Sequence, residues 1–285
     1  MVRTVVILTL LAAPLGFAQT GYQNSGHLKA ETERSVVSLS AKLKEVNQPT
    51  SLDAELQAQC KANCSDSKLQ TQMASLNAQR LRASNEFVVQ IHQSVDAYMV
   101  GTLNGHIEGI RPHRVAQDLK QILGETAVAE PAAFLLESPH GRMLVVFYAI
   151  GAGTAMTSST TLRAYQLSGK RVQLAGTTGG DMDGYGNLWV KQLRSPELPD
   201  GLWLLVGGQA FGANGPNIRM CVYAYDGEKF ATKWMPANVW GTFTVSLTGR
   251  GFQVDGPYYR EDKQRHDAYF IAEDGLYLCR LHQCQ

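Results

Sequence analysis

The sequence predicts an α+β protein in which N-terminal helices precede an antiparallel β domain. The chain before residue 125 contains no tryptophan, is rich in Gln, Ala, Ser, Lys and Leu, and places apolar residues at helical spacing. After residue 132, short segments rich in β-branched and aromatic residues alternate with glycine-containing turns, which is typical of antiparallel strands. This second part also repeats itself, since similar segments open at Gly141 and Gly201, a shift of 60 residues.

The first 18 residues have the pattern of a secretory signal peptide. Arg3 gives a positive start, Val5–Ala13 is a short apolar run, and Gly16 and Ala18 are the small residues required before a cleavage site. The apolar run is too short to span a hydrocarbon core of about 30 Å, so no membrane span is expected after cleavage. We therefore expect a mature chain that starts at residue 19 and is secreted or periplasmic.

Residues 19–125 are predicted to be a helical region built around a helical hairpin. A first apolar stripe ends before Pro49, and a longer one predicts a single helix of about 30 residues. Pro112 and Gly124 are typical first-turn and stop residues of a further helix. The longer stripe is irregular, which favours packing within the molecule, and oligomerisation through a helical seam is the alternative. Its residues are Leu69, Met73, Leu76, Ala83, Phe87, Ile91, Val95 and Tyr98, interrupted by Arg80.

Residues 126–285 are predicted to form the β repeat domain, entered through a linker at 126–131. Each repeat reads as a meander of four antiparallel strands, whose last two strands are joined by a tight glycine-containing turn. These turns fall at Ser168-Gly169, Asp226-Gly227 and Asp274-Gly275. The three four-strand units lie near 132–176, 187–235 and 241–281.

A repeated four-strand meander resembles the blades of the β-propeller-type repeats of secreted bacterial proteins. The resemblance covers the C-terminal half and rests on the strand pattern rather than on a signature motif. It implies a propeller-like domain in which each unit is one blade. Because three blades are fewer than propellers usually have, a β-sandwich or a barrel is the alternative.

All five cysteines lie in the exported part of the chain, where disulfides persist. One helical turn would bring the Cα atoms of Cys60 and Cys64 to about 6 Å, within reach of a bridge. Cys279 and Cys284 are the second candidate pair, with Cys221 as a competing partner. Because five is odd, at least one thiol stays free or pairs between chains.

Charge excludes one class of partner. Removal of the signal, which contains Arg3 as its only charged residue, leaves 25 basic and 25 acidic residues. A chain without net charge has no electrostatic attraction to nucleic acid, so no nucleic-acid partner is expected. The basic residues are also interspersed along the chain, which argues against a phosphate-binding face.

The longest loops of the three units are predicted to emerge at one end of the β domain. In a four-strand meander, the loop between the second and third strands and the crossover to the next unit lie at the same end. Function usually resides on such loops when a rigid scaffold holds them. We expect these loops to bind a protein or glycan partner through Trp240, Tyr258, Tyr259 and Arg260.

One of these crossovers, at 180–187, resembles the calcium loops of integrin-type repeat propellers, with oxygen ligands that alternate around glycines. Alternation lets every second side chain point inward to a hard cation. The resemblance implies Asp181, Asp183 and Asn187 as calcium ligands. Tyr185 stands where a third acidic ligand belongs, so weak binding is expected, and a plain polar turn is the alternative.

The sequence contains no nucleophile–base motif, so no catalytic residue is assigned and no cofactor besides the candidate calcium is expected. We therefore predict a non-catalytic binding module that uses the long-loop face. One alternative is a hydrolase that uses carboxylates on the same face. A second alternative is a structural assembly protein that oligomerises through its helices.

Overall fold

The computed structural model describes residues 25–63, 65–139, 141–151, 158–194, 201–212, 215–235, 239–241, 243–257, 264–272 and 275–280. Within these residues the chain forms helices first and antiparallel sheets second, so the predicted α+β class is confirmed. The predicted signal peptide and the expected start of the mature chain lie outside the described residues.

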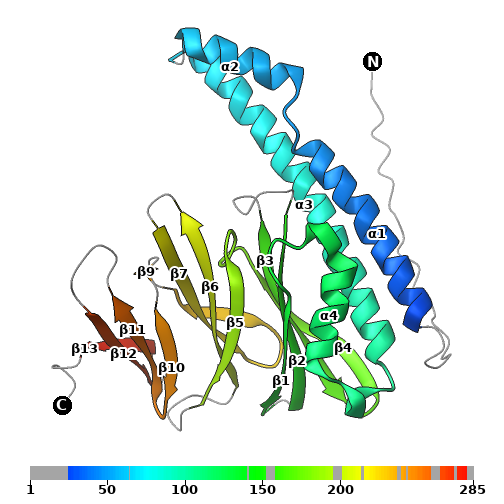
Figure 1. Ribbon diagram of the computed structural model, residues 1–285, viewed down its shortest axis with the longest axis vertical. Coiled ribbons are helices and arrows are strands. Elements are labelled where there is room, and N and C mark those ends of the chain that lie inside the picture. The colour runs from blue at the N-terminus through cyan, green and yellow to red at the C-terminus, as the bar shows by residue number, and fades with distance from the viewer. Residues whose placement is uncertain are drawn as a thin grey trace, which may run out of the picture.

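The N-terminal part consists of helices, two of which form an antiparallel hairpin (Figure 1). The hairpin partners are α1 and α3, and α4 packs beside them over the first sheet. α3 has 37 residues, which corresponds to a length of about 55 Å. The helices and short 3₁₀ turns are α1 (Ser25–Val46), α2 (Ser51–Asn63), α3 (Ser67–Leu103), η2 (Ile107–Gly109), α4 (Pro112–Leu123) and η3 (Gly124–Thr126).

Three sheets follow, and each is an antiparallel meander whose strands pair in chain order. Sheet A contains β1 (Ala132–Ser138), β2 (Gly141–Ile150), β3 (Ser159–Ser168) and β4 (Arg171–Gly179). Sheet B contains β5 (Gly186–Leu193), β6 (Leu202–Gly212), β7 (Gly215–Tyr225) and β8 (Phe230–Trp234), with the short β9 (Val239–Trp240) paired to β7. Sheet C contains β10 (Thr244–Thr248), β11 (Gly251–Pro257), β12 (Gln264–Ala272) and β13 (Gly275–Arg280).

The sheets stack face to face, and the helices cover the outer face of sheet A (Figure 1). Strand β2 shows why sheet A lies between the helices and sheet B. Its side chains point alternately to the two faces of the sheet, and each face contributes to a different core. Leu144, Val146 and Tyr148 pack against the helices, whereas Val145 and Phe147 pack against sheet B. A third core lies between sheets B and C. β2 is therefore apolar on both faces because it lies in the middle of the stack.

The three sheets remain separate, and the strands of the described residues do not close into a barrel. Each sheet coincides closely with one of the three four-strand units expected from the repeat. The outer face of sheet C carries Gln253, Asp255 and His266, which hydrogen-bond to one another. A polar face of this kind is suited to contact with water and can end the stack.

The segment at 126–131, expected to be a linker, is held against sheet A. The backbone N–H of Val128 donates to the carbonyl of Ala149 at 3.1 Å, and that of Gly151 donates to the carbonyl of Thr126 at 3.0 Å. Thr126 itself is buried. The helices and sheet A thus share one apolar core and a hydrogen-bonded connection.

A polar network fixes the second half of α3 to sheet A. Asp96 accepts hydrogen bonds from Arg163, one of them from Nε at 2.7 Å, and from the hydroxyl of Tyr165 at 2.6 Å. One turn earlier, His92 Nδ1 lies 2.9 Å from the hydroxyl oxygen of Tyr148. Burial lowers the pKa of His92 to about 3, and the positive charge of Arg163 contributes to this shift. The imidazole is therefore neutral at neutral pH.

The first half of α3 projects beyond sheet A. α3 ends beside the β3–β4 turn, where the side-chain oxygen of Asn104 accepts a hydrogen bond from the backbone of Val172 at 2.6 Å. From Asp96, α3 extends back 29 residues to its start, about 44 Å. From the paired Arg163, β3 extends back only four residues, about 13 Å. The helix therefore projects by roughly 30 Å.

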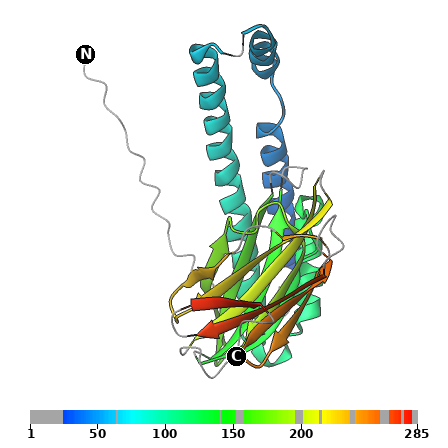
Figure 2. The ribbon, with the colours of Figure 1, turned by 90° about the vertical axis from the view of Figure 1, so that its left-hand side faces the viewer.

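We call the projecting part, α2 and residues 67–87 of α3, the helical arm. It rises at the end of the stack where β2 ends and β3 begins, which we call the long-loop end. The opposite end, with the β3–β4 turn, is the hairpin end. Figures 1 and 2 both show the tip of the arm lying above the sheets.

Candidate interaction surface

At the long-loop end, the crossover at 180–185 is bound to the start of β3. Asp183 accepts a hydrogen bond from the backbone N–H of Thr160 at 2.6 Å. The N–H of Gly184 donates to the hydroxyl of Ser158 at 2.9 Å. Removal from water raises the pKa of Asp183, and the nearby charge of Asp181 acts in the same direction. The crossover from sheet A to sheet B is thus held on its sheet A side.

The same crossover is bound to sheet B through Asp181. Its carboxylate accepts hydrogen bonds from the hydroxyls of Tyr223 at 2.9 Å and Thr232 at 3.0 Å. Its backbone carbonyl accepts a bond from Arg219 at 2.8 Å, and the Arg219 guanidinium lies 5.1 Å from the ring centre of Tyr185. Asp181 therefore joins β7 and β8 to the crossover.

The predicted calcium ligands occupy different environments. Asp181 and Asp183 lie close enough to interact electrostatically, whereas the side chain of Asn187 lies 3.4 Å from that of Gln209. Two further oxygens, Thr160 Oγ1 and Asn217 Oδ1, are buried without a hydrogen-bond partner. Over the described part of the chain, no cluster of three or more His, Cys, Asp or Glu residues could hold a metal ion. Calcium binding stays a prediction.

The predicted aromatic site lies largely outside the described residues, which do not include Tyr258, Tyr259 and Arg260. The backbone of Trp240 pairs with Asn217 at the start of β7. The next residue, Gly241, donates to the carbonyl of Pro216 at 2.9 Å. Residues 239–241 therefore lie at the long-loop end, next to the start of β7.

Of the predicted disulfide residues, Cys60 takes part in a disulfide bond. Cys64 and Cys284 lie outside the described residues, and Cys279 is described only as a backbone position opposite Ala268. Cys221 is a buried free thiol, and burial raises its pKa to about 11. Its thiolate is therefore scarce at neutral pH, which makes it unreactive.

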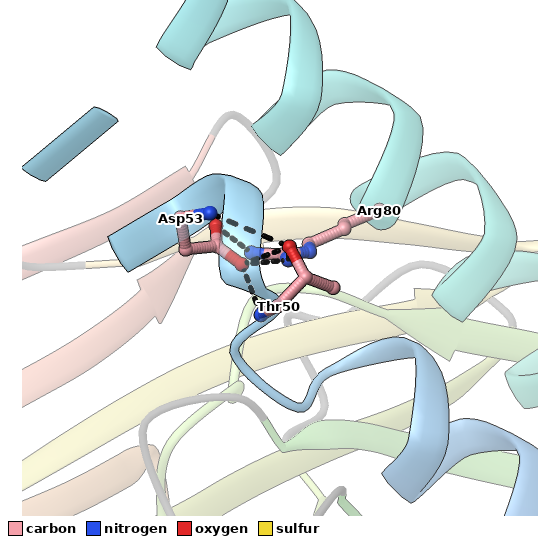
Figure 3. Close-up of polar contacts among 3 residues, drawn as sticks. All are labelled: Thr50, Asp53 and Arg80. Atoms are coloured by element: carbon pink, nitrogen blue, oxygen red, sulfur yellow. Dashed lines mark hydrogen bonds and ion pairs between the residues drawn. The ribbon is translucent and has the colours of Figure 1, made fainter. Parts of the chain in front are cut away.

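Within the arm, an ion pair joins α2 to α3, and we call it the Arg80–Asp53 clamp (Figure 3). Arg80 donates to both carboxylate oxygens of Asp53, one of them at 2.5 Å. Asp53 also accepts from the backbone N–H of Thr50 at 2.5 Å, so it caps the first turn of α2. The Arg80 hydrogen bond is the main reason that the pKa of Asp53 is lowered. Arg80, which interrupts the apolar stripe in the sequence, thus serves as a cross-brace.

One face of the arm is exposed and uncharged. In the second half of α3, His92, Asp96 and Met99 face sheet A. Steps of three and four residues back along the same face reach Val88, Asn85, Leu81, Ala78 and Ala74. Leu81 is 63% exposed, and neighbouring Val89 is 51% exposed. We call Ala74, Ala78, Leu81 and Asn85 the underside of the arm, because they continue the sheet-facing side of α3. Val88, one turn below, already packs against the main core.

Sequence reasoning missed the underside, although its spacing was available as a signal. The pattern was hidden because the stripe facing α1 and α2 contains larger apolar residues and dominates the periodicity. What reveals the underside is the length of α3 relative to sheet A. A helix face of this composition is normally covered, and here the sheet ends before the helix does.

A cavity of about 300 Å³ lies at the opposite, hairpin end. It is formed where the end of β5 meets the β10–β11 turn. Among the described residues that line it, Arg194 is the only one that ionises. These residues are Gln192, Leu193, Arg194, Leu247, Thr248 and Gly251.

Comparison with known proteins adds no family, because the chain matches no family model, no curated protein and no solved structure. In the parts of the chain that the structure describes, no helix combines the length and the apolar character needed to cross a membrane.

Proposed function

We propose that the protein is an exported, non-catalytic interaction module that binds a protein partner with its helical arm and long-loop end. The observation that carries the proposal is the common position of these two features. α3 is parallel to β3 and extends past the start of β3, so the arm and the crossover at 180–185 lie at the same end of sheet A (Figure 1). We further propose that the three sheets are propeller-like units arranged as an open stack.

The composition of the underside favours a protein partner over a glycan. Leu81 is more than half exposed, and an exposed apolar side chain gains free energy when another apolar surface covers it. Both elements are also positioned by side-chain contacts, the Arg80–Asp53 clamp on the arm and Asp181 at the long-loop end. Contacts that position a surface before binding reduce the conformational entropy lost on binding.

Site-specific photo-crosslinking in the source organism tests the proposal. A photoreactive amino acid replaces Leu81 on the arm or Thr177 near the long-loop end, and the control replaces exposed Glu228 at the hairpin end. We expect the same protein adduct from the first two positions and not from the third. Equal adducts from all three positions, or none from the first two, would contradict the proposal.

A further inference from the structure

The underside of the arm requires a partner with a matching uncharged helix face, and the chain itself contains one. The face carries two small residues, Ala74 and Ala78, followed one turn later by the larger Leu81. Small residues allow a second helix to approach closely, and large residues fill the space beside them. In an antiparallel second copy, the order of small and large residues along the helix is reversed. The large residues of one copy then lie opposite the small residues of the other.

We infer that two copies of this chain associate through their arms, antiparallel about a two-fold axis near Ala78. This inference rests on the proposed function and names the partner of that surface. In this register Ala78 meets its own symmetry copy, and Leu81 packs over Ala74 of the partner subunit. A closed two-fold contact uses the same surface on both copies, so it ends at the dimer.

Charge along one flank of the arm favours this register. This flank carries exposed Lys68, Arg82 and Glu86. Lys68 and Glu86 lie 18 residues apart, which is five helical turns, so they share one side of α3. In the antiparallel arrangement Glu86 comes within reach of Lys68 of the partner subunit, and symmetry repeats the pair. The opposite flank is uncharged, with Gln70, Asn77 and Ser84. A parallel arrangement would therefore form neither ion pair.

The shape of the molecule also excludes a parallel arrangement. The underside continues into the part of α3 that lies on sheet A through His92 and Met99. A parallel copy of α3 would therefore run into sheet A, whereas an antiparallel copy needs only the projecting part. It also brings the tip of each arm to the long-loop end of the other subunit, so both proposed surfaces take part.

The first test is sedimentation of the chain that starts at residue 19, measured over a range of micromolar concentrations. We expect a monomer–dimer equilibrium for the unchanged chain. Leu81→Glu should weaken the dimer by at least about 100-fold, since each dimer loses two buried leucines. Val37→Glu is the matched control, because Val37 is 66% exposed on α1, away from the underside. A monomer at all concentrations, or a dimer insensitive to Leu81→Glu, overturns the inference.

The second test exchanges the charges. Lys68→Glu alone should weaken the dimer roughly tenfold, because two attractive pairs become repulsive. Adding Glu86→Lys to the same chain should restore it, since the pairs are then re-formed with reversed sign. Both sites are exposed, so the circular dichroism spectrum should stay unchanged. No weakening by the first change, or no rescue by the second, contradicts the antiparallel register.

The third test uses a single cysteine. Ala78→Cys should form a disulfide between copies under mild oxidation, whereas Val37→Cys should not. This separates the inference from the proposed function. If Ala78→Cys does not cross-link while Leu81 and Thr177 still give a shared adduct with a different protein, the second copy is the wrong partner and the interaction surface stands. If both fail, the surface itself is not a binding site.

Discussion

Asp96 is the residue on which the direction of the helical arm depends most. Its carboxylate accepts hydrogen bonds from Arg163 and Tyr165 of β3. In the ion pair, the side chain of Asp96 is only 16% exposed and that of Arg163 only 10%. A guanidinium this far from water is stabilised only while its carboxylate partner is present. The contact therefore fixes α3 on sheet A at a point about two turns below the arm.

Asp96→Ala should lower the free energy of unfolding by about 3 kcal/mol, because it leaves the buried charge of Arg163 without a partner. Urea denaturation measures this. The control is Glu125→Ala, which breaks the exposed Lys44–Glu125 pair and should cost less than about 1 kcal/mol. Similar losses of unfolding free energy for the two variants would show that the Asp96–Arg163 ion pair stabilises the fold no more than an exposed ion pair does.

His92 should make stability fall as the pH decreases. Its pKa is about 3 in the folded state and about 6.5 in the unfolded state, so the unfolded chain binds more protons between these values. Stability is thus full above pH 6.5 and is lost as the pH falls, by about 2 kcal/mol between pH 7 and pH 5. His92→Gln should remove this part of the pH dependence. If the stability of the variant falls between pH 7 and pH 5 as steeply as that of the unchanged chain, His92 is not the cause of the pH dependence.

Asp183 allows a test of the calcium prediction that separates binding from folding. Millimolar calcium should raise the melting temperature if the folded state binds the ion. Asp183→Asn should abolish that rise and keep the fold, because an amide oxygen can still accept the hydrogen bond from Thr160. No thermal shift for the unchanged chain would leave the crossover as a polar turn.

At the scale of elements, the arm consists of two helices with unequal support. α1 ends where Asn47 contacts Ser84 at 2.9 Å, so beyond this point α3 has only α2 beside it. α2 carries the Arg80–Asp53 clamp, the buried Leu56 and the disulfide-bonded Cys60, whereas the second half of α3 lies in the main core. The tip of the arm should therefore be the least stable part of the described helices.

Arg80→Ala should loosen α2 without unfolding the protein. Amide hydrogen exchange should accelerate in residues 51–60, while residues 91–103 keep their protection because they are buried against sheet A. Arg82→Ala, at an exposed position two residues away, is the control and should leave both regions unchanged. Faster exchange throughout α3 would mean that the arm and the core open together.

At the scale of the whole molecule, the helices and sheet A form one unit. The apolar core between them contains residues from α1, α3, α4, β2 and β3. Removing the helices would expose one complete face of β2 and β3, including Tyr148 and Tyr165. An exposed apolar face of this size causes aggregation in an isolated domain.

A chain that starts at residue 126 should therefore fail to give a soluble monomer. In contrast, a chain in which a short flexible linker replaces residues 48–83 should fold, because Asn47 and Ser84 are neighbours and the core is untouched. Circular dichroism and thermal melting of the two proteins make the comparison. A cooperative melt of the first protein would show that the β part is independent of the helices.

Much of the fold could be predicted because its signals are local. Pro112 begins α4 and Gly124 ends it at a φ of 50°, a conformation for which glycine is suited. Gly169 and Gly227 also have positive φ in their hairpin turns. Chain connectivity then places the start of β7 and the crossover from sheet B to sheet C at one end of sheet B, as the Gly241–Pro216 contact illustrates.

The sequence by itself determined the helical front, the positions of the turns and the four-strand units, because each depends on neighbours along the chain. Only the tertiary structure decided what those elements contact. Asp96 and Arg163 are 67 residues apart, and β2 is apolar on both faces, so no periodicity states which face meets the helices. The exposure of the underside also depends on the tertiary structure, because it depends on how far α3 extends beyond the start of β3. Packing between distant segments sets that difference, and a pattern read along one segment does not contain it.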